Sequence, residues 1–396
     1  MDLSTFEALL APAGQAALVE AAELGPSEET FLADLTRLQK RHPSDLAKAA
    51  LETVILRVKA QRKFSRAGQM YFSREALEQS SGEGVARYRG ARYAFFRSIG
   101  DLACGLGGDA LGLADTGQAH LTLVDHDPLR LALARANLAA CGHAGRAAFV
   151  CGDLTTTPLP AVEALWFDPA RRDEGRRLFS VHNYHPPLAI VKDWLPQIPA
   201  LGVKISPGVD LAELAGYAAE IEFISEGGEL KECVLWFGPL RSAATGGTRS
   251  FRRATLLPGP HTLVADPAGA PTVGAPLAYL YEPDPAVLRA GLVTTLAARI
   301  NARQIDPSIG YLTSETLTST PFARAFAIEA ALPFQLKRLR AALRARGVGQ
   351  VTVKKRGSPL EPQALIRQLK LSGAESRIVF LTQVSGKPYA LIGRAC

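Results

Sequence analysis

The sequence predicts an α/β protein with a doubly wound parallel sheet, an N-terminal helical region and a small C-terminal α+β part. Three observations predict this fold class. Between residues 98 and 240, short apolar runs alternate with helical stretches, which is typical of βαβ units. Residues 1–80 carry apolar side chains at three-to-four spacing, which indicates helices. The last part of the chain alternates between helical and strand-like stretches, which predicts a separate small module.

The expected elements follow one another in a regular order. The strands of the sheet are expected at SIGDLAC, AHLTLVD, AAFVCGD, ALWFDP, LGVKIS and ECVLWFG. Residues 240–276 are rich in Gly, Ala, Pro and Thr, which indicates a domain junction. We therefore expect a helical region over 1–80, the sheet domain over 81–242, a linker with a small α+β region over 243–330, and a basic α+β domain over 331–396.

Composition indicates a soluble globular protein, because 47% of the residues are hydrophobic and 21% are charged. The sequence holds no apolar run of the ~20 residues that a membrane span needs. Its first residues, MDLSTFEALLAPAG, lack the features of a signal peptide, so we expect a cytoplasmic protein that does not act on membranes. The five cysteines form no C-x-x-C pair, and no histidine pair has the H-E-x-x-H spacing, so we expect no metal.

Positive charge gathers in one part of the chain. The net charge is +7, from 45 Lys and Arg against 38 Asp and Glu. Residues 333–360 hold no acidic residue. Such a stretch favours an acidic partner such as nucleic acid, although solvated helix faces are an equally simple explanation. The candidates for contact with nucleic acid in this stretch are Lys337, Arg338, Lys354, Lys355 and Arg356.

A glycine-rich loop follows the first expected strand, in DLACGLGGDALGLA. Gly105 and Gly107 allow a sharp turn and a close approach by a ligand. The spacing to Ala110 also fits a dinucleotide-binding loop. However, Asp101 and Asp109 would repel a diphosphate at short range. S-adenosylmethionine carries an ammonium and a sulfonium cation, so acidic residues suit it better.

Acidic residues also end the next two strands. Asp125 is placed to bind the two ribose hydroxyls, a role that fits a nicotinamide cofactor equally well. Asp153 follows Gly152 and could accept a hydrogen bond from an adenine amine. The residues expected to bind the cofactor are Asp101, Ala103, Cys104, Gly105, Gly107, Asp109, Asp125, His126, Asp153 and Leu154.

Taken together, these motifs resemble those of class I S-adenosylmethionine-dependent methyltransferases. DLACGLGG, VDHDP, CGDL and FDPA match the family's glycine loop, ribose-binding acid, G-D turn and D-P-type loop, in that order. The resemblance covers roughly residues 77–240. It implies a Rossmann-like methyltransferase sheet and S-adenosylmethionine as the cofactor.

Two narrower resemblances extend this one. LEQSSGEGVARYRGARYA is similar to the segment that closes over the cofactor in trimethylguanosine synthase-like enzymes. The motifs LEQSSGE, FDPARRDEG, VKISPGVD and GGELKECVLWFG resemble an uncharacterised bacterial methyltransferase family that ends in a ferredoxin-like piece and a THUMP-like domain. VKKRGSPLEPQALIRQLKL resembles part of that last domain, and THUMP domains bind RNA, often tRNA. The aromatic residue that stacks the cap guanine in the synthases has no counterpart here, because Ala170-Arg171 stands in its place.

The loop after the fourth strand, WFDPARRDEGRR, carries the expected chemistry. Asp168 could accept a hydrogen bond from the N–H of an exocyclic amine of a base, assisted by the peptide carbonyl at Pro169. A turn cap is the simpler role for Asp168. Arg171 and Arg172 are candidate phosphate contacts, or they could pair with acidic residues in a solvated turn.

A second route is methylation of a ribose 2′-OH, which commonly uses a Lys-Asp-Lys-Glu set. Asp168 and Lys204 could supply two members, with Glu229 or Glu232 as the third. The first lysine is not assigned. C5 methylation is disfavoured because no cysteine lies in the loop after the fourth strand.

The sequence thus predicts a methyltransferase that acts on nucleic acid, with tRNA or rRNA favoured. A DNA amino-methyltransferase is the enzymatic alternative, although such enzymes usually carry an aromatic residue where Arg171 stands. An RNA-binding protein with an inactive methyltransferase fold is the alternative without enzymatic activity.

Overall fold

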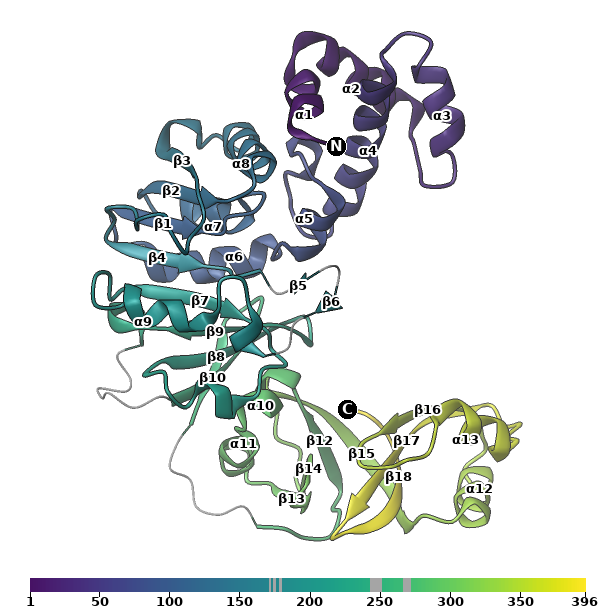
Figure 1. Ribbon diagram of the computed structural model, residues 1–396. Helices are drawn as coiled ribbons and strands as arrows, with labels where there is room; N and C mark the ends of the chain where they lie inside the picture. Colours follow the sequence, from purple (N-terminus) through teal and green to yellow (C-terminus); the bar gives the residue numbers. More distant parts are fainter. Residues whose placement is uncertain (171, 174–175, 178–179, 243–250, 266–271) are drawn as a thin grey trace. The chain divides into compact units, whose positions relative to one another are not determined.

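A computed structural model describes residues 1–170, 172–173, 176–177, 180–242, 251–265 and 272–396. The chain forms two compact units (Figure 1). Unit 1 comprises residues 1–221 and 231–250, and unit 2 comprises residues 222–230 and 251–396. The division into four segments along the sequence stays a prediction.

Unit 1 begins with helices packed around a small apolar core. Pro12 stands at the first position of the second helix, where its missing N–H costs nothing, and Gly25 ends that helix with a φ of 59°. Phe6 and Leu9 from the first helix and Leu51 from the fourth are buried. The six helices are α1 (Leu3–Leu10), α2 (Pro12–Leu24), α3 (Phe31–Leu38), α4 (Ser44–Ala60), α5 (Arg74–Gln79) and α6 (Glu83–Gly90).

The sheet of unit 1 has the strand order β9-β7-β4-β1-β2-β3. Its strands are β1 (Ser98–Leu102), β2 (His120–Asp125), β3 (Ala147–Cys151), β4 (Ala164–Phe167), β7 (Leu201–Ile205) and β9 (Glu229–Trp236). The pairs β2–β3, β1–β2, β1–β4 and β4–β7 are parallel, as the sequence predicted. The prediction of a parallel sheet is wrong for β9, which runs antiparallel to β7. β9 follows β8 (Glu220–Glu226) after a two-glycine turn, and such a short connection reverses the chain.

Helices connect the parallel strands, as Figure 1 shows. They are α7 (Gly108–Thr116), α8 (Pro128–Ala140) and α9 (Val191–Trp194). Asp127 caps α8 by accepting a hydrogen bond from the Leu129 amide. Two short strands, β5 (Arg172–Asp173) and β6 (Arg176–Arg177), follow β4 and pair with each other antiparallel. Trp166 and Trp236 pack against each other and are fully buried in the sheet domain.

Unit 2 is built on a seven-stranded sheet with the order β13-β14-β12-β15-β18-β17-β16. The strands of this sheet are β12 (Tyr279–Pro283), β13 (Arg303–Asp306), β14 (Ile309–Ser314), β15 (Ala323–Pro333), β16 (Val348–Lys355), β17 (Glu375–Val384) and β18 (Lys387–Ala395), and the helices of the unit are α10 (Pro285–Ala290), α11 (Val293–Arg299), α12 (Leu336–Arg344) and α13 (Pro362–Leu369). The unit also contains β10 (Phe251–Leu257) and β11 (His261–Val264), which pair with each other antiparallel and lie outside the seven-stranded sheet. The boundary expected between residues 330 and 331 falls inside β15. This strand pairs with β12 on one side and β18 on the other, so it joins both halves of the sheet.

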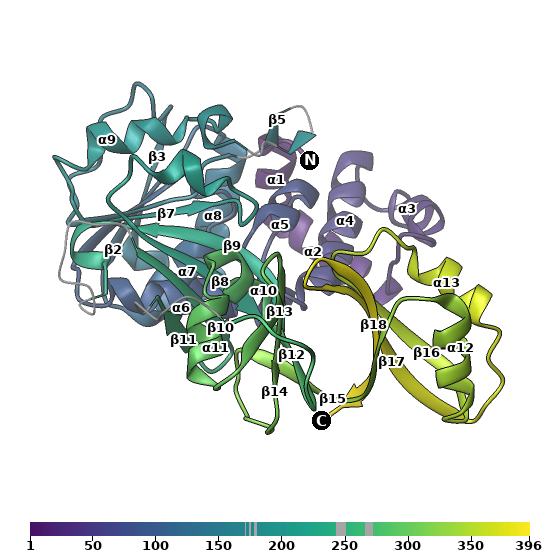
Figure 2. The same ribbon diagram turned by 90° about the horizontal axis from the view of Figure 1, so that it is seen from below.

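Figures 1 and 2 show α12 and α13 on the same side of β16, β17 and β18. Leu339 and Leu343 of α12 and Leu365 and Leu369 of α13 pack there in one buried cluster. The charged residues of α12 therefore lie on its outer side, at the spacing of an amphipathic helix. In the described part of the chain, no helix has both the length and the apolar character needed to cross a membrane.

Candidate cofactor and catalytic site

The glycine loop lies at the carboxyl end of β1, where ligands of such sheets bind. Ala103, Gly105 and Gly107 all have left-handed backbones, with φ values of 59°, 56° and 81°. A Cβ at Gly105 would meet no atom within 4 Å, so this side of the loop is open to a ligand. A Cβ at Gly107 would lie 3.0 Å from the Leu138 side chain, so this glycine lets the loop pack on α8.

Asp101 is a buried acidic residue that lies under this loop. It is 1% exposed, and neither carboxylate oxygen has a hydrogen-bond partner among the described residues. Burial, reinforced by the nearby carboxylates of Asp109 and Asp168, raises the pKa of Asp101 well above its usual range. A buried acceptor without a donor is costly, so it indicates a missing cationic or hydrogen-donating ligand.

The other expected cofactor residues lie along the same edge. The Gly105 amide donates to Asp125 Oδ2 at 2.9 Å, which ties the loop to the end of β2. His126 follows Asp125 and is largely exposed, with Nδ1 3.4 Å from Asp125 Oδ1. After β3, exposed Asp153 accepts from the Thr155 amide, and Leu154 is half-buried. Hydrogen bonds from the Thr155 amide and hydroxyl lower the pKa of Asp153.

Two expected cofactor residues have other partners. Cys104 is buried, which raises the pKa of its thiol, so it packs in the loop as a neutral group. Asp109 forms an ion pair with Arg89 and accepts from Trp166 Nε1 at 3.0 Å. Burial would raise the pKa of Asp109, but the charges of Arg89 and Lys204 outweigh it and lower the pKa. Asp109 therefore anchors the neighbouring network.

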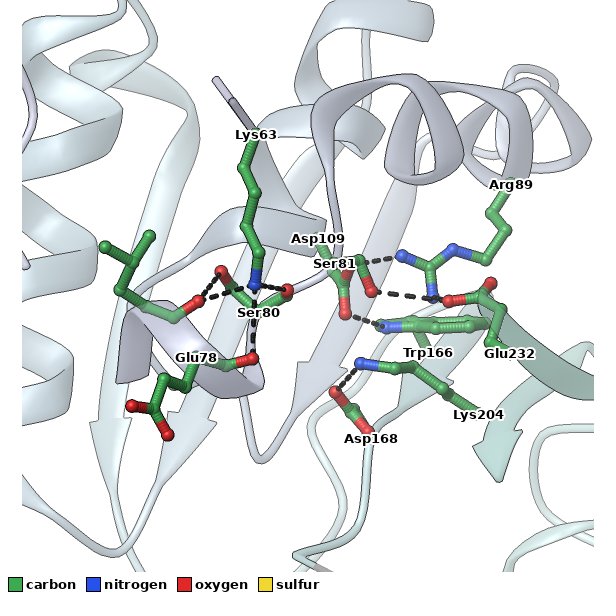
Figure 3. Close-up of polar contacts among 12 residues, drawn as sticks. Lys63, Glu78, Ser80, Ser81, Arg89, Asp109, Trp166, Asp168, Lys204 and Glu232 are labelled. Carbon is green, nitrogen blue, oxygen red and sulfur yellow. Dashed lines mark hydrogen bonds and ion pairs between the residues drawn. The ribbon is translucent and has the colours of Figure 1, made fainter. Parts of the chain in front are cut away.

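Arg89 of α6 is the centre of that network (Figure 3). Its guanidinium bonds Asp109, donates to Glu232 Oε2 at 3.1 Å and lies 4.3 Å from the centroid of the Trp166 ring. Ser81 donates to the same Glu232 oxygen at 3.3 Å. Burial would lower the pKa of Arg89, but the two carboxylates outweigh it and raise the pKa. Arg89 thus holds α6, α7, β4 and β9 together.

Two glycines allow α6 to approach α7 closely enough for this contact. A Cβ at Gly90 would lie 2.5 Å from the Gly112 carbonyl oxygen. A Cβ at Gly112 would lie 2.5 Å from the Ala86 carbonyl carbon. The helix backbones touch at these points, and this approach brings Arg89 to Asp109.

Asp168 and Lys204 form a second charged group at the ends of β4 and β7. Lys204 Nζ donates to Asp168 Oδ2 at 2.5 Å, and the Asp168 amide donates to the Leu102 carbonyl at 3.2 Å. The Lys204 side chain is 4% exposed and the Asp168 side chain 22%. Pro169 is buried beside them. The structure therefore brings together all three residues that the sequence predicted to be catalytic.

Acidic side chains outnumber basic ones in this region. Four acidic side chains (Asp101, Asp109, Asp168 and Glu232) lie with two cations (Arg89 and Lys204), and burial raises the pKa of Asp101 and of Glu232. S-adenosylmethionine carries an ammonium, a sulfonium and one carboxylate, so it brings a net positive charge. The orphaned Asp101, the open face of Gly105 and the surplus of acidic side chains all fit this cofactor, whose cations would favour the ionised acids, whereas a diphosphate would oppose their ionisation.

Lys63 is a further lysine near this site, and the sequence did not single it out as functional. Its Nζ donates to the carbonyls of Leu77, Glu78 and Ser80 at 2.7, 3.1 and 2.8 Å (Figure 3). Burial, with the charge of Lys204 contributing, lowers the pKa of Lys63 to about 8. All three ammonium hydrogens are used, so Lys63 holds the segment that enters α6.

The sequence did not predict Arg89, Trp166 or Ser81 as site residues. The signal for Arg89 was the pair of glycines that allows α6 to approach α7, but the two glycines lie on different helices, so the sequence alone does not show that they meet. Of the two candidate glutamates, Glu232 is buried beside Arg89, whereas Glu229 lies at the exposed start of β9.

The expected nucleic-acid contacts lie in several places. Arg171 lies outside the described residues, and only the backbone of Arg172 is described. Lys337 and Arg338 are exposed on α12. Lys354 pairs with Glu282, Lys355 pairs with Glu361, and Arg356 stacks on the Tyr311 ring at 5.2 Å. In the described residues, no cluster of three or more His, Cys, Asp or Glu could hold a metal ion.

Comparison with known proteins identifies the parts of this chain. A family profile described as a methyltransferase domain matches residues 99–167, and one described as THUMP domain-like matches residues 323–395. A profile described only as a domain of unknown function matches residues 2–60.

Relatives match nearly the whole chain. An uncharacterized S-adenosylmethionine-dependent methyltransferase of Mycobacterium tuberculosis, from strains CDC 1551 and H37Rv, is 34% identical over 348 residues. The match covers 86% of this chain and 94% of the relative. A crystal structure from Porphyromonas gingivalis W83, provisionally described as a methyltransferase, has the same fold at 24% identity. Its TM-score is 0.75, and the match covers 94% of this chain and 99% of that one.

These matches confirm the resemblance that the sequence motifs indicated, including the Rossmann-like sheet and the C-terminal THUMP-like part. The chain belongs to the S-adenosylmethionine-dependent methyltransferases, with S-adenosylmethionine as its cofactor and a THUMP-like domain over residues 323–395.

Proposed function

We propose that this methyltransferase transfers the methyl group of S-adenosylmethionine to an exocyclic amine of a nucleic-acid base, with RNA as the substrate. The cofactor supplies an electrophilic methyl group on its sulfonium. Asp101, Gly105 and Asp125 would hold the cofactor at the ends of β1 and β2. Asp168 would then act on the substrate at the adjoining end of β4.

The observation that carries this proposal is the geometry of Asp168. Lys204 binds its Oδ2, and among the described residues Oδ1 has no hydrogen-bond partner. The side chain is partly exposed, whereas Lys204 is buried beneath it. Lys204 is thus a positioning residue that fixes the carboxylate, and Oδ1 can accept one N–H of an incoming amine.

This acceptor answers a specific chemical need. The lone pair of an exocyclic amine is delocalised into the base, and a hydrogen bond to the amine helps to localise it. The nitrogen would form a bond to the cofactor's methyl carbon as the bond from that carbon to sulfur breaks. The cofactor's sulfur would keep that bonding pair, and the nitrogen would give up one proton toward Asp168. Positioning the two reactants would supply much of the rate.

Methylation of a ribose 2′-OH is the second candidate function. Asp168, Lys204 and Glu232 lie in one region, and the charge of Lys63 couples to that of Lys204. A Lys-Asp-Lys-Glu set would therefore take Lys63 as its first lysine. However, the Lys63 ammonium donates its hydrogen bonds to backbone carbonyls, and Glu232 accepts hydrogen bonds from Arg89 and Ser81. These contacts favour the amine.

The choice of RNA rests on the C-terminal part of the chain. Residues 323–395 are THUMP-like, and the stretch from 333 to 360 holds no acidic residue. Arg171, Arg172, Lys337, Arg338, Lys354, Lys355 and Arg356 are the proposed phosphate contacts. Phosphate contacts position a nucleic acid without reading its bases, so the preference for RNA rests on the THUMP-like part.

Transfer of tritiated methyl from S-adenosylmethionine to total RNA, DNA and protein tests this function. We expect label in RNA with the wild type. The Asp168→Asn variant should lose at least about a hundredfold in rate but keep its affinity for the cofactor. Asp193→Asn is the matched control, because Asp193 is exposed on α9, and it should transfer like the wild type.

The outcomes separate the alternatives. Label in DNA alone would replace the RNA proposal by a DNA amino-methyltransferase. A protein that binds RNA but transfers no methyl would be the inactive binding protein. Full activity in Asp168→Asn would remove Asp168 from the chemistry.

A further inference from the structure

Unit 2 contains a cavity of about 570 Å³ that no part of the proposed chemistry uses. Chain segments from β10, β11, β12, β15 and β16 meet around it. A volume of this size is within the range of sites for small ligands, and it suits one nucleotide rather than a duplex. Four prolines form part of its wall, namely Pro258, Pro283, Pro285 and Pro321. Their rings are rigid apolar surfaces.

Arg324 is the most available cation of this cavity. It lies on β15, is exposed and has no hydrogen bond or ion pair among the described residues. Gly228 has a φ of +81°, and a Cβ there would come within 2.8 Å of Arg324 Nη2. The bare glycine therefore leaves the space that the guanidinium occupies, so Arg324 is directed along the cavity wall.

Two further cations reach the cavity from the end of β16. Lys354 and Arg356 both line it, whereas Lys355 pairs with Glu361. Lys354 and Arg356 face the cavity and Lys355 faces away from it because successive side chains alternate along an extended chain. The Arg356 guanidinium lies over the Tyr311 ring, 5.2 Å from its centroid, which orients the guanidinium. Of the three consecutive basic residues, the structure thus directs the first and third to the cavity.

The acidic residues of the cavity already have partners. Glu282 binds Lys354, and Asp284 accepts from the Ala286 amide at 2.8 Å as the cap of α10. The two guanidinium groups of Arg324 and Arg356 are left without a carboxylate among the described residues. Two guanidinium groups beside rigid apolar walls match a ligand with an anionic end and a flat, apolar body.

We propose that this cavity binds one single-stranded nucleotide of the nucleic-acid substrate, with its phosphate on Arg324 and Arg356. The inference rests on the proposed function and adds a second point of contact, within unit 2 itself. The nucleotide's sugar and base would lie against the proline wall. The cavity would thereby favour a single-stranded segment over a duplex, in which the bases are not free to enter.

Fluorescence anisotropy with a labelled single-stranded oligoribonucleotide and the full-length protein tests this inference. We expect Arg324→Ala and Arg356→Ala each to weaken binding about tenfold, and the double variant to reduce the salt dependence by about one to two phosphate contacts. Arg367→Ala is the matched control, since Arg367 is an exposed arginine of α13 in the same unit. It should bind as the wild type does. Adenosine monophosphate should compete with the oligonucleotide better than inorganic phosphate does.

Each other outcome overturns the inference. Unchanged binding by the double variant would show that the cavity does not hold RNA. Equal competition by inorganic phosphate would reduce the cavity to a simple anion site. The wild type's methyl transfer separates this inference from the proposed function. If the wild type transfers methyl to RNA while the double variant binds RNA normally, only the cavity assignment fails. If the wild type neither binds nor methylates nucleic acid, both fail.

Discussion

Replacing Asp101 by asparagine should stabilise the protein without its cofactor and weaken cofactor binding. The Asp101 carboxylate is 1% exposed, and neither oxygen has a partner among the described residues. Asparagine has nearly the same shape but no charge. It therefore removes the repulsion from Asp109 and Asp168, and it also removes the anionic acceptor that would bind the cofactor's ammonium.

The expected magnitudes follow from the burial of this group. A buried unsatisfied polar group costs about 1–3 kcal/mol, and we expect the variant to recover about 1 kcal/mol because its amide stays unpaired. A hydrogen bond to a charged group is worth about 1.5–3 kcal/mol, which corresponds to about a ten- to hundredfold loss of cofactor affinity.

The pH dependence has a definite sign. Because burial raises the pKa of Asp101, the folded protein binds this proton more tightly than the unfolded chain does. The stability of the cofactor-free wild type should therefore fall as the pH rises from the usual aspartate value of 3.8 toward the raised value. This contribution should be absent in Asp101→Asn. Binding of the cofactor's ammonium should expel the proton from Asp101, so wild-type affinity should rise with pH over the same interval.

Chemical denaturation across pH and calorimetric titration with S-adenosylmethionine measure these effects. Titration in two buffers with different ionisation enthalpies reports the released proton. Asp193→Asn serves as the exposed control here too. The reasoning is refuted if Asp101→Asn binds the cofactor as tightly as the wild type, or if both proteins release the same number of protons.

Three further predictions concern the network around the site. Arg89→Met should lower the free energy of unfolding by about 3–5 kcal/mol, because it leaves the buried acidic side chains of Asp109 and Glu232 without their shared cation. An unchanged free energy of unfolding in urea would contradict this prediction. Gly112→Ala should lower the free energy of unfolding by about 1–3 kcal/mol, because the added methyl group pushes α6 away from α7. Gly117→Ala is its control: a Cβ there has its nearest contact at 3.5 Å, so thermal unfolding should change little. Lys63→Met should lower the free energy of unfolding by about 2 kcal/mol and speed amide hydrogen exchange over residues 77–81. Lys48→Met, which changes an exposed lysine of α4, should do neither.

The sheet and its ligand loop could be predicted because their signals are local. Each parallel strand is a short apolar run. Asp125 and Asp168 stand directly at strand ends, and Gly105 lies in the loop that follows β1. The antiparallel direction of β9 had a signal too, the Gly227-Gly228 turn, but the regular alternation of strands and helices before it favoured another parallel strand.

The partners of the site residues could not be predicted. Asp109 lies in the glycine loop by sequence, but its role depends on Arg89, 20 positions earlier, and on Trp166, 57 positions later. Likewise, Lys63 contacts a segment that only the fold brings to it. Such contacts depend on how closely helices and strands approach, which follows from packing and not from spacing along the chain.

Nucleoside mass spectrometry of RNA methylated by the wild type tests the central claim most directly. After reaction with labelled S-adenosylmethionine and complete digestion of the RNA, the position of the new methyl group identifies the acceptor. We predict a nucleoside with the methyl group on an exocyclic nitrogen of its base, and none when Asp168→Asn replaces the wild type. A methyl group on the ribose would contradict the assignment of the acceptor, and label recovered only in protein would contradict the proposed function itself.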